Sequence, residues 1–315
     1  LLLSGAVILS SCSKDSPTPA PTNLDCNGVE NGTSLTDDCG DCQQAYIYNM
    51  TSHEVTLLDD TAGVVLSDPM DMIIMPDNPM NPYWNAGCAG ATYAFSHQGQ
   101  STVSYGGQTT RLDMASEMMS ALASASTNEA MLNGMFENSG NYFSDDALNA
   151  ATKQIKSKTA VGAENALTTS EQAAVVALFP IWFADYATNV APIIGDPSMM
   201  AAPGVAGWVG NRELNAKGLE YDQIVAKSLI GALCLDQVVN NYLSNTVLGV
   251  ADNADRSNGY TTMEHKWDEA FGYVYGKFGP DNKLGDLSTD GLLGKYLNKP
   301  GFETEKAVVF QAFVD

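Results

Sequence analysis

One stretch of the chain places an imidazole and two carboxylates one helical turn apart. His265 precedes Asp268 by three residues and Glu269 by four, so on a helix the three side chains share one face. Histidine nitrogens and carboxylate oxygens are common ligands of zinc and other transition metals, which makes this face a candidate metal half-site. A further ligand must come from another element, and Glu220 is the candidate. A solvated helix face with a simple His–Glu contact is the alternative interpretation.

A second candidate ion site lies near the N-terminus, in residues 25–43. This segment is dense in Asp, Asn, Gly and Cys and nearly free of apolar side chains, so it needs disulfides or a metal to be ordered. Oxygen ligands in a Gly-rich loop suit Ca²⁺, and the candidate ligands are Asp25, Asn27, Asp38 and Asp41. A zinc site through the C-x-x-C pair and a disulfide-pinned spacer without an ion are the alternatives. The segment resembles one unit of the Cys/Asp-rich repeats of secreted bacterial proteins, which look like thrombospondin type 3 repeats.

A third feature is a polar stripe on an otherwise apolar helix predicted over residues 215–248. Its polar side chains fall within about a third of the helix circumference, at about 100° per residue. They are Glu220, Gln223, Lys227, Gln237 and Asn241. Because buried polar groups must be paired, the stripe is either an internal hydrogen-bond network or a wall that faces a ligand.

The sequence contains no P-loop, no G-x-S-x-G, no G-x-G-x-x-G after a strand and no H-E-x-x-H. These absences favour a non-catalytic protein over an enzyme. A metallohydrolase built on His265 and its neighbouring carboxylates remains an alternative function, and a structural or interaction module at the cell surface is a third.

The elements that position these residues are mostly helical. Thr261 and Glu264 form a capping box that starts a helix over 261–276. Strands are predicted at 45–50 and 54–58 as a hairpin, and at 91–95 and 101–105, with a long loop over 68–90. Further helices are predicted over 111–125, 128–136, 145–158, 168–190 (kinked or broken at Pro180) and 303–315. The fold class is therefore mainly α, a helical bundle-like body with a small β-rich N-terminal lead.

The first twelve residues have the pattern of a lipoprotein signal. An apolar run too short to span a bilayer ends in Leu-Ser-Ser-Cys, so we expect Cys12 to be lipidated. The predicted layout is a signal peptide and lipobox (1–12), a disordered Ser/Pro/Thr tether (13–24), the Cys/Asp-rich repeat (25–43), a β-rich lead and loop (44–90) and a helical domain (91–315) that continues beyond the last residue. The predicted location is the outer membrane, periplasmic or surface-facing, with the lipid as the membrane anchor.

Charge limits the partners. The chain carries 15 basic and 37 acidic residues, a formal charge of −22, and so repels nucleic acid and attracts cations. A disulfide between Cys88 and Cys234 is compatible with the sequence, and so is a buried free thiol at Cys234.

Several phrases resemble the domain-of-unknown-function family 4856 of envelope lipoproteins. They are Tyr93–Phe95, Ser104–Leu112, Lys153–Lys158, Asn215–Tyr221 and Glu264–Tyr273. The resemblance covers about residues 90–315 and implies a helical body similar to imelysin-like proteins, which are linked to iron uptake and carry a G-x-H-x-x-E signature. Here Asp268 stands three residues after the histidine, with Glu269 next. The expected function is an envelope lipoprotein that binds a cation or a metal-bearing ligand without catalysis.

Overall fold

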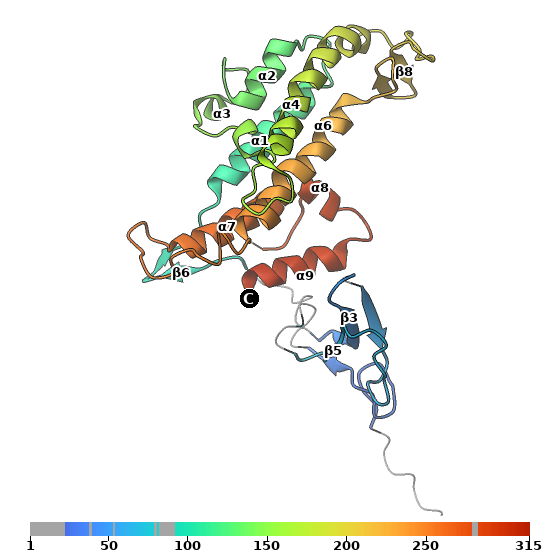
Figure 1. Ribbon diagram of the computed structural model, residues 1–315, viewed down its shortest axis with the longest axis vertical. Helices are drawn as coiled ribbons and strands as arrows, with labels where there is room; N and C mark the ends of the chain where they lie inside the picture. The colour runs from blue at the N-terminus through green and yellow to red at the C-terminus, as the bar shows by residue number, and fades with distance from the viewer. Residues whose placement is uncertain (1–22, 38–39, 53, 79–80, 82–91, 279–282) are drawn as a thin grey trace, which may run out of the picture. The chain divides into compact units, whose positions relative to one another are not determined.

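The computed structural model describes residues 23–37, 40–52, 54–78, 81, 92–278 and 283–315. The chain divides into two compact units, Leu1–Asn85 and Ala86–Asp315. The predicted signal peptide, Cys12 and tether residues 13–22 lie outside the described residues. Figure 1 labels the main elements of both units.

The first unit is built from short antiparallel strands. β1 (Leu35–Thr36) pairs with β2 (Cys42–Gln43), while β3 (Ala45–Asn49) lies between β4 (Val55–Leu58) and β5 (Asp71–Ile74). The predicted β3–β4 hairpin is confirmed, with the central pair Ile47↔Thr56. The prediction of an unbroken loop over 68–90 is wrong, because β5 lies inside it. The apolar run before Pro76 extends along β3 and buries Ile74, a tertiary pairing that propensity does not reveal.

The second unit is mainly α-helical, which confirms the predicted fold class. Its α-helices are α1 (Gly106–Ala121), α2 (Glu129–Glu137), α3 (Asp146–Ala150), α4 (Thr169–Asp185), α5 (Ala191–Ile194), α6 (Tyr221–Leu229), α7 (Thr262–Tyr275), α8 (Leu293–Leu297) and α9 (Glu303–Val314). Two small hairpins accompany them, β6 (Ser96–His97) with β7 (Gln100–Ser101) and β8 (Gly207–Val209) with β9 (Arg212–Leu214). The predicted strands at 91–95 and 101–105 are therefore displaced toward the turn at Gly99.

The core of this unit forms where α1 packs against α2, α6 and α7. Phe271 of α7 stacks on Tyr93 with ring centroids 3.5 Å apart and contacts Phe310 of α9 at 5.9 Å. A second aromatic group joins α2 to α4, where Phe136 stacks on Phe179 at 4.8 Å. All five rings are almost fully buried. Burial of apolar surface therefore fixes α7 against α9 and against the segment around Tyr93, which precedes α1 in the same unit.

Two predicted helices are changed by tertiary contacts. The helix expected over 215–248 starts only at residue 221 and continues as π-helical segments, Ile230–Leu235 and Val238–Tyr242. Gly218 has φ +80° in the turn that precedes it, which favours glycine and ends any helix there. The helix expected over 145–158 is limited to α3 and a 3₁₀ turn, Lys156–Lys158. The Asn138 side chain donates to the carbonyls of residues 148, 151 and 153, which draws the chain away from helical pairing.

α4 contains Pro180 yet remains helical to Asp185, where a π-helical segment, Tyr186–Val190, follows. Of the predicted kink or break at Pro180, the break is therefore wrong. Within the described residues, 169–194 form one helix long and apolar enough to cross a membrane by length and composition alone. Phe179, Phe183 and Val190 of this helix are fully buried in the core, whereas Leu178 and Ile181 are exposed and 22% of the apolar window is buried.

Candidate functional site

α7 is fixed at its start by local hydrogen bonds and along its length by close contact with α1. The Thr261 hydroxyl accepts from the Glu264 N–H (3.1 Å), and Glu264 accepts from the Thr261 N–H (2.7 Å), which confirms the capping box. Further along, a Cβ at Gly272 would lie 2.7 Å from the Tyr105 Cβ and 2.9 Å from the Gln108 Cβ. Glycine is therefore required for the approach of the two helices.

The three predicted ligands on α7 turn toward different partners. Asp268 is 3% exposed; its two carboxylate oxygens accept from the Tyr93 hydroxyl (2.5 Å) and the Ser104 N–H (2.7 Å). Glu269 accepts from Lys266 at 2.6 Å. It also accepts from the Gln108 amide of α1 at 3.1 Å. Asp268 therefore binds the segment before α1, whereas Glu269 faces α1 itself.

His265 lies between these groups without bonding closely to either. Its Nε2 is 3.9 Å from the Glu269 carboxylate, and its ring stacks on Tyr260 with centroids 4.6 Å apart. The fourth predicted ligand, Glu220, pairs with Arg212 of β9. In the described part of the chain, no group of three or more His, Cys, Asp or Glu side chains is arranged to hold a metal ion. The structure therefore does not bring the four residues to one point.

Burial decides the charge of these groups. It raises the pKa of Asp268 from 3.8 to about 6, although the Tyr93 and Ser104 hydrogen bonds oppose the change. Burial also acts against the charged form of Glu269, but the bond and charge of Lys266 outweigh it and lower that pKa. The pKa of His265 is lowered, chiefly by burial. At neutral pH the site therefore holds two carboxylates and a neutral imidazole.

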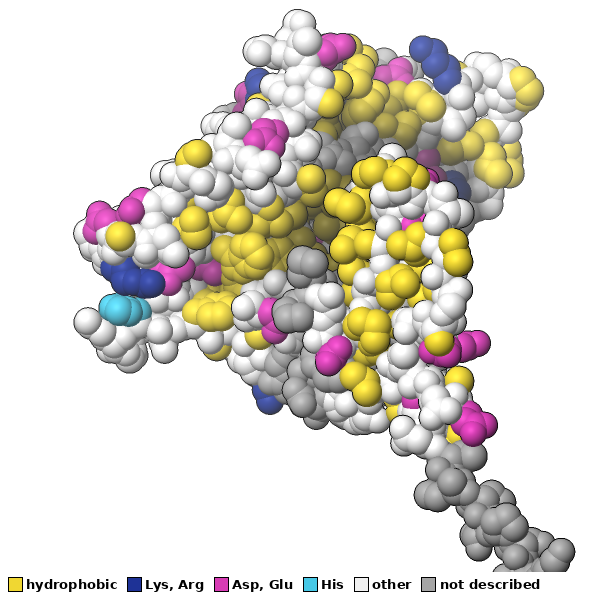
Figure 2. Space-filling model, turned by 60° about the horizontal axis from the view of Figure 1, so that its bottom comes forward, with side chains coloured by type: hydrophobic (Ala, Val, Ile, Leu, Met, Phe, Trp, Pro, Cys, Tyr) yellow, Lys and Arg dark blue, Asp and Glu magenta, His cyan; other side chains and the backbone are white. Residues whose placement is uncertain are grey.

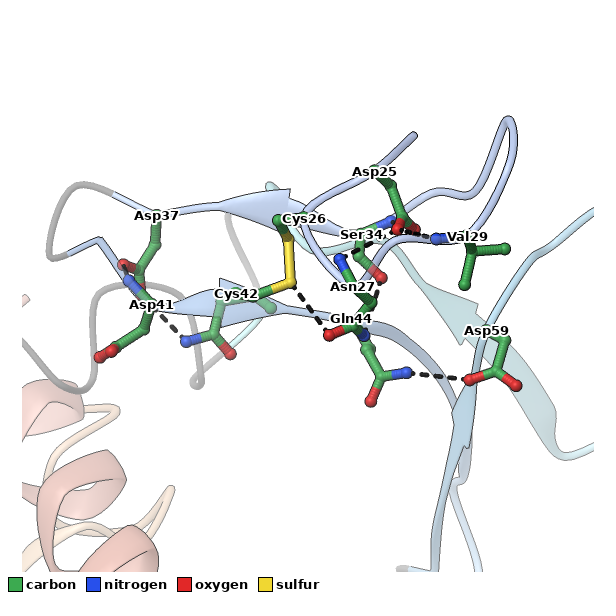
Figure 3. The surroundings of a disulfide bond; sticks show 11 residues. Asp25, Cys26, Asn27, Val29, Ser34, Asp37, Asp41, Cys42, Gln44 and Asp59 are labelled. Atoms are coloured by element: carbon green, nitrogen blue, oxygen red, sulfur yellow. Dashed lines mark hydrogen bonds between the residues drawn. A yellow bond between two sulfur atoms is a disulfide. The ribbon is translucent and has the colours of Figure 1, made fainter. Parts of the chain in front are cut away.

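Asp25, one of the predicted calcium ligands, accepts hydrogen bonds from the backbone of its own loop. Asp25 accepts from the N–H groups of Asn27, Val29 and Ser34 at 2.9–3.0 Å. Burial opposes ionisation of Asp25, and these hydrogen bonds overcome it and lower the pKa. Asp41 lies instead at the other side of the disulfide Cys26–Cys42, as Figure 3 shows.

At that side, the Asp41 N–H donates to Asp37 at 2.8 Å. Asn27 remains near Asp25, with its amide 3.3 Å from the Ser34 hydroxyl. The remaining candidate, Asp38, lies outside the described residues, so the structure brings together only Asp25 and Asn27 of the predicted set.

The polar stripe bonds largely within itself. Lys227 donates to Gln223 at 2.5 Å and Asn241 donates to Gln237 at 3.0 Å. Gln237 is fully buried, and in the described part of the chain its Nε2 has no hydrogen-bond partner. The predicted disulfide partner Cys88 lies outside the described residues, and Cys234 is a buried free thiol.

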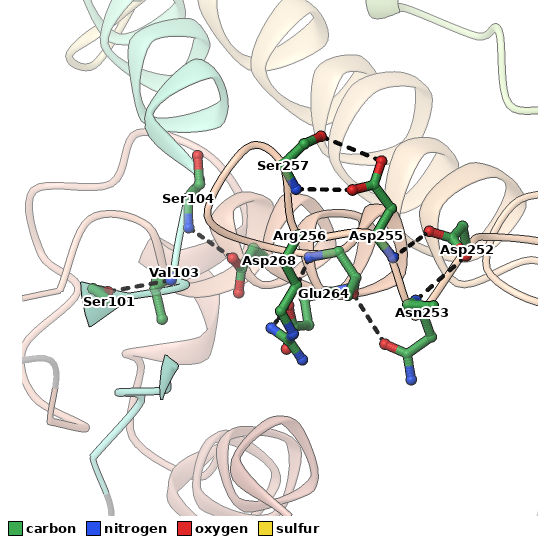
Figure 4. A network of polar contacts seen from close by, with 12 residues as sticks. Ser101, Val103, Ser104, Asp252, Asn253, Asp255, Arg256, Ser257, Glu264 and Asp268 are labelled. Atoms are coloured by element: carbon green, nitrogen blue, oxygen red, sulfur yellow. Dashed lines mark hydrogen bonds and ion pairs between the residues drawn. The ribbon is translucent and has the colours of Figure 1, made fainter. Parts of the chain in front are cut away.

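A cavity of about 470 Å³ opens beside α7 on the side of Asp268. Its apolar wall includes Phe95, Met263, Trp267 and Phe313, and its polar lining includes Asp268, Asn253 and the Arg256–Glu264 ion pair (2.6 Å). Figure 4 shows Asp268 bonded to Ser104 on one side of α7, with Asn253 and Arg256 on the loop before the helix and Glu264 in its first turn. The Trp267 indole N–H donates to the Phe313 carbonyl at 3.0 Å. The ring therefore offers only its apolar surface to the cavity.

Several important residues were not singled out as site residues from sequence. Tyr93 and Ser104 donate hydrogen bonds to Asp268, yet they precede it by 175 and 164 positions. The only signal for them in the sequence is that both lie in segments that resemble the family. A second buried network joins Asp185, Asn215 and Tyr221, with the Asn215 amide 2.7 Å from Asp185. It closes the turn before α6, a local role that the Asn and Gly residues of that turn could have suggested.

Comparison with known proteins gives a family for the helical unit. A family model described as a domain of unknown function, DUF4856, matches residues 90–315. No curated protein and no solved structure matches the chain.

Proposed function

Because the chain belongs to the DUF4856 family, a name that carries no activity, we propose a function from the site itself. The helical unit is a non-catalytic binding domain of an envelope lipoprotein, and its ligand is a small organic cation with an apolar body. The observation that carries the proposal is the placement of the Asp268 carboxyl in the wall of an apolar cavity.

The chemistry of the cavity selects such a ligand. Concave apolar pockets of a few hundred Å³ with a few polar groups are typical of small-molecule sites. Glu264 is neutralised by Arg256, whereas Asp268 has only neutral donors and is ionised above its pKa of about 6. A cation therefore gains both a carboxylate and the faces of Trp267 and Phe95, which attract positive charge.

Fluorescence titration tests the proposal. We expect benzyltrimethylammonium to change Trp267 emission at pH 7.5 and to bind at least about tenfold more tightly than neutral benzyl alcohol, because only the cation interacts with the carboxylate. The affinity should fall below pH 6, where Asp268 is protonated.

A filled cavity provides the decisive control. Leu248→Trp places a large ring in the lining and should abolish binding, whereas Leu235→Trp, at an exposed position (44% accessible) away from this lining, should leave it unchanged. Equal affinity for cation and alcohol, or unaltered binding in Leu248→Trp, would refute the proposal.

The location of the protein is a separate part of the proposal. Lipidation of Cys12 would hold the domain at the outer membrane, because the apolar run ending at Leu-Ser-Ser-Cys suits a signal peptidase for lipoproteins. Cys12→Ser should move the full-length protein from the membrane to the soluble fraction, and mass spectrometry of the wild-type N-terminus should detect the lipid. An unmodified Cys12 contradicts this part alone.

The metal-bearing version of the ligand, including iron uptake, has less support. Asp268, Glu269 and Glu220 have other partners, as described above, and within the described residues these side chains and His265 do not form a group that could hold a metal ion. Metal analysis of purified protein separates the two versions. If the purified protein contains a stoichiometric transition metal and a folded His265→Ala variant lacks it, the ligand is a metal and not an organic cation.

A further inference from the structure

The helical unit exposes a loop whose side chains are almost all apolar. Residues 199–210, which include β8, read Met-Met-Ala-Ala-Pro-Gly-Val-Ala-Gly-Trp-Val-Gly, and we call them the apolar loop. Met200 is 62% exposed, Val205 54% and Val209 53%. Figure 1 shows β8 at one end of the unit, away from α7. The apolar loop is therefore distinct from the cation cavity, and a continuous exposed apolar surface of this kind marks an interaction site.

The backbone of the apolar loop is hydrogen-bonded within the loop itself. At the tip, the Val205 N–H donates to the Ala202 carbonyl at 2.8 Å, and further down the Trp208 N–H donates to the Met199 carbonyl at 2.7 Å. A Cβ at Gly207 would lie 2.4 Å from the backbone of the opposite arm, so glycine permits this close approach. The two arms thus pair polar backbone groups with each other. Such pairing lowers the cost of moving a backbone out of water and into lipid.

The side chains of the apolar loop offer no hydrogen bond to a partner. The one polar hydrogen among them, on the Trp208 indole nitrogen, is already donated to the Ile193 carbonyl at 3.0 Å. No Asp, Glu, Lys or Arg occurs from residue 197 to residue 211. Interfaces between proteins have about one hydrogen bond per 100–200 Å². A surface without charges or side-chain hydrogen-bonding groups therefore suits a hydrocarbon phase better than a specific protein partner.

The helix that leads to the apolar loop is also apolar on its outer side. In the described part of the chain, residues 169–194 form one helix long and apolar enough to cross a membrane, and 22% of its apolar window is buried. Leu178 is 40% exposed and Ile181 62%. A helix that is apolar all round is normally covered on all sides by protein or lipid. Because Phe183 fixes this helix in the core, its exposed side indicates contact with a lipid surface and not a membrane crossing.

A cation lies at the base of the apolar loop. A cleft of about 400 Å³ separates the loop from the turn before α6, and its lining includes Val205, Val209, Leu214 and Lys217. Lys217 is exposed, and no carboxylate of the described residues forms an ion pair with it. A lysine beside an apolar surface can lay its stem along hydrocarbon while its ammonium stays at the level of the lipid headgroups.

We propose that the apolar loop binds a phospholipid membrane by inserting its tip into the outer part of the bilayer, with Lys217 at the level of the phosphate groups. Burial of the exposed Met and Val side chains drives the insertion. Charge does not drive it, because the chain has a formal charge of −22 and its Lys and Arg side chains form small separate spots among wider hydrophobic areas on the face drawn in Figure 2. The loop therefore suits a zwitterionic surface.

Fluorescence quenching by vesicles tests the insertion. The probe is phosphatidylcholine with brominated acyl chains, because bromine quenches an indole only at close range. The protein is the chain from residue 12 with Cys12→Ser, so that neither the predicted signal peptide nor an acyl chain contributes. We expect the indole that Val205→Trp adds at the tip to be quenched. Val250→Trp is the matched control, since Val250 is 76% exposed and lies beyond the far end of the helical stretch 221–242; its indole should stay unquenched.

Sedimentation with phosphatidylcholine vesicles measures the affinity. Met200→Asp changes an exposed side chain and so should leave the fold intact, which circular dichroism checks. It should lower the partition coefficient at least about tenfold, because an apolar side chain no longer enters the lipid and a charge would have to. Val250→Asp should change the coefficient less than twofold. Adding phosphatidylglycerol should not strengthen binding, because the acidic chain is repelled by anionic lipid.

Two results overturn the proposal. One is equal quenching of the added indole in Val205→Trp and Val250→Trp, or equal partition of Met200→Asp and Val250→Asp. The other is a dimer of the parent chain that Met200→Asp dissociates, together with an unquenched indole in Val205→Trp. That result would make the apolar loop an interface between two copies of the chain.

Discussion

The pKa of Asp268 makes the stability of the helical unit depend on pH in a direction opposite to that of most carboxylates. Asp268 is 3% exposed, and burial raises its pKa from 3.8 to about 6. The folded state therefore keeps the proton over a pH range in which the unfolded chain has released it. As pH rises from about 4 to about 6, the unfolded state is stabilised by ionisation of this carboxyl and the folded state is not, so the free energy of unfolding falls.

The magnitude follows from the size of the shift. A difference of roughly two pKa units corresponds to about 3 kcal/mol, at about 1.4 kcal/mol per unit. An asparagine side chain cannot ionise, so Asp268→Asn should lose this dependence. The loss of the Tyr93 and Ser104 hydrogen bonds should have the same effect at every pH. The unfolding free energy of Asp268→Asn minus that of wild type should therefore be about 3 kcal/mol more positive at pH 7 than at pH 3.5.

Urea unfolding followed by tryptophan fluorescence measures this difference, because Trp182, Trp208 and Trp267 all lie in the helical unit. Asp286→Asn is the matched control. Hydrogen bonds from Ser288 lower the pKa of the exposed Asp286, so its replacement should cost more at neutral pH than in acid. A free-energy difference between Asp268→Asn and wild type that is the same at pH 3.5 and pH 7 would refute the reasoning.

Three further perturbations follow from local geometry. Gly272→Ala places a Cβ 2.7 Å from that of the α1 N-cap residue and should destabilise the helical unit by about 2 kcal/mol, whereas Gly231→Ala, with no atom within 4 Å, should be neutral or slightly stabilising in the same urea assay. Thr261→Ala removes the α7 N-cap bond and should lower the unfolding free energy by about 1 kcal/mol; no change in the urea midpoint contradicts the capping role. Replacing Cys26 and Cys42 by Ser opens a loop with a sequence separation of 16 and should lower the unfolding free energy of the first unit by about 3 kcal/mol. The first unit of this variant should then be cleaved by proteases faster than that of the oxidised wild type. Equal cleavage rates argue against a stabilising disulfide.

The sequence predicted the elements whose signals are local. The helix start at residue 168, the capping box at Thr261 and the β3–β4 hairpin are all in the structure, because each depends on residues within a few positions of one another. The mainly α fold class follows from the same local signals. The helix start at Asn128 is a further example, since its side chain accepts from the Met131 N–H at 2.9 Å.

The tertiary structure decided the length of elements and the partners of charged groups. α3 ends early because the side chain of Asn138, the C-cap residue of α2, donates to the carbonyls that would continue a helix. The spacing of His265, Asp268 and Glu269 correctly placed them on one helix, but it did not determine where each side chain bonds.

Asp268 bonds to Tyr93 and Glu269 to Gln108 across sequence separations of 175 and 161 residues. No periodicity in a single segment records such contacts. They result from the packing of α7 against α1 and the preceding segment, which buries the Asp268 carboxylate among neutral donors and leaves that of Glu269 bonded to Lys266.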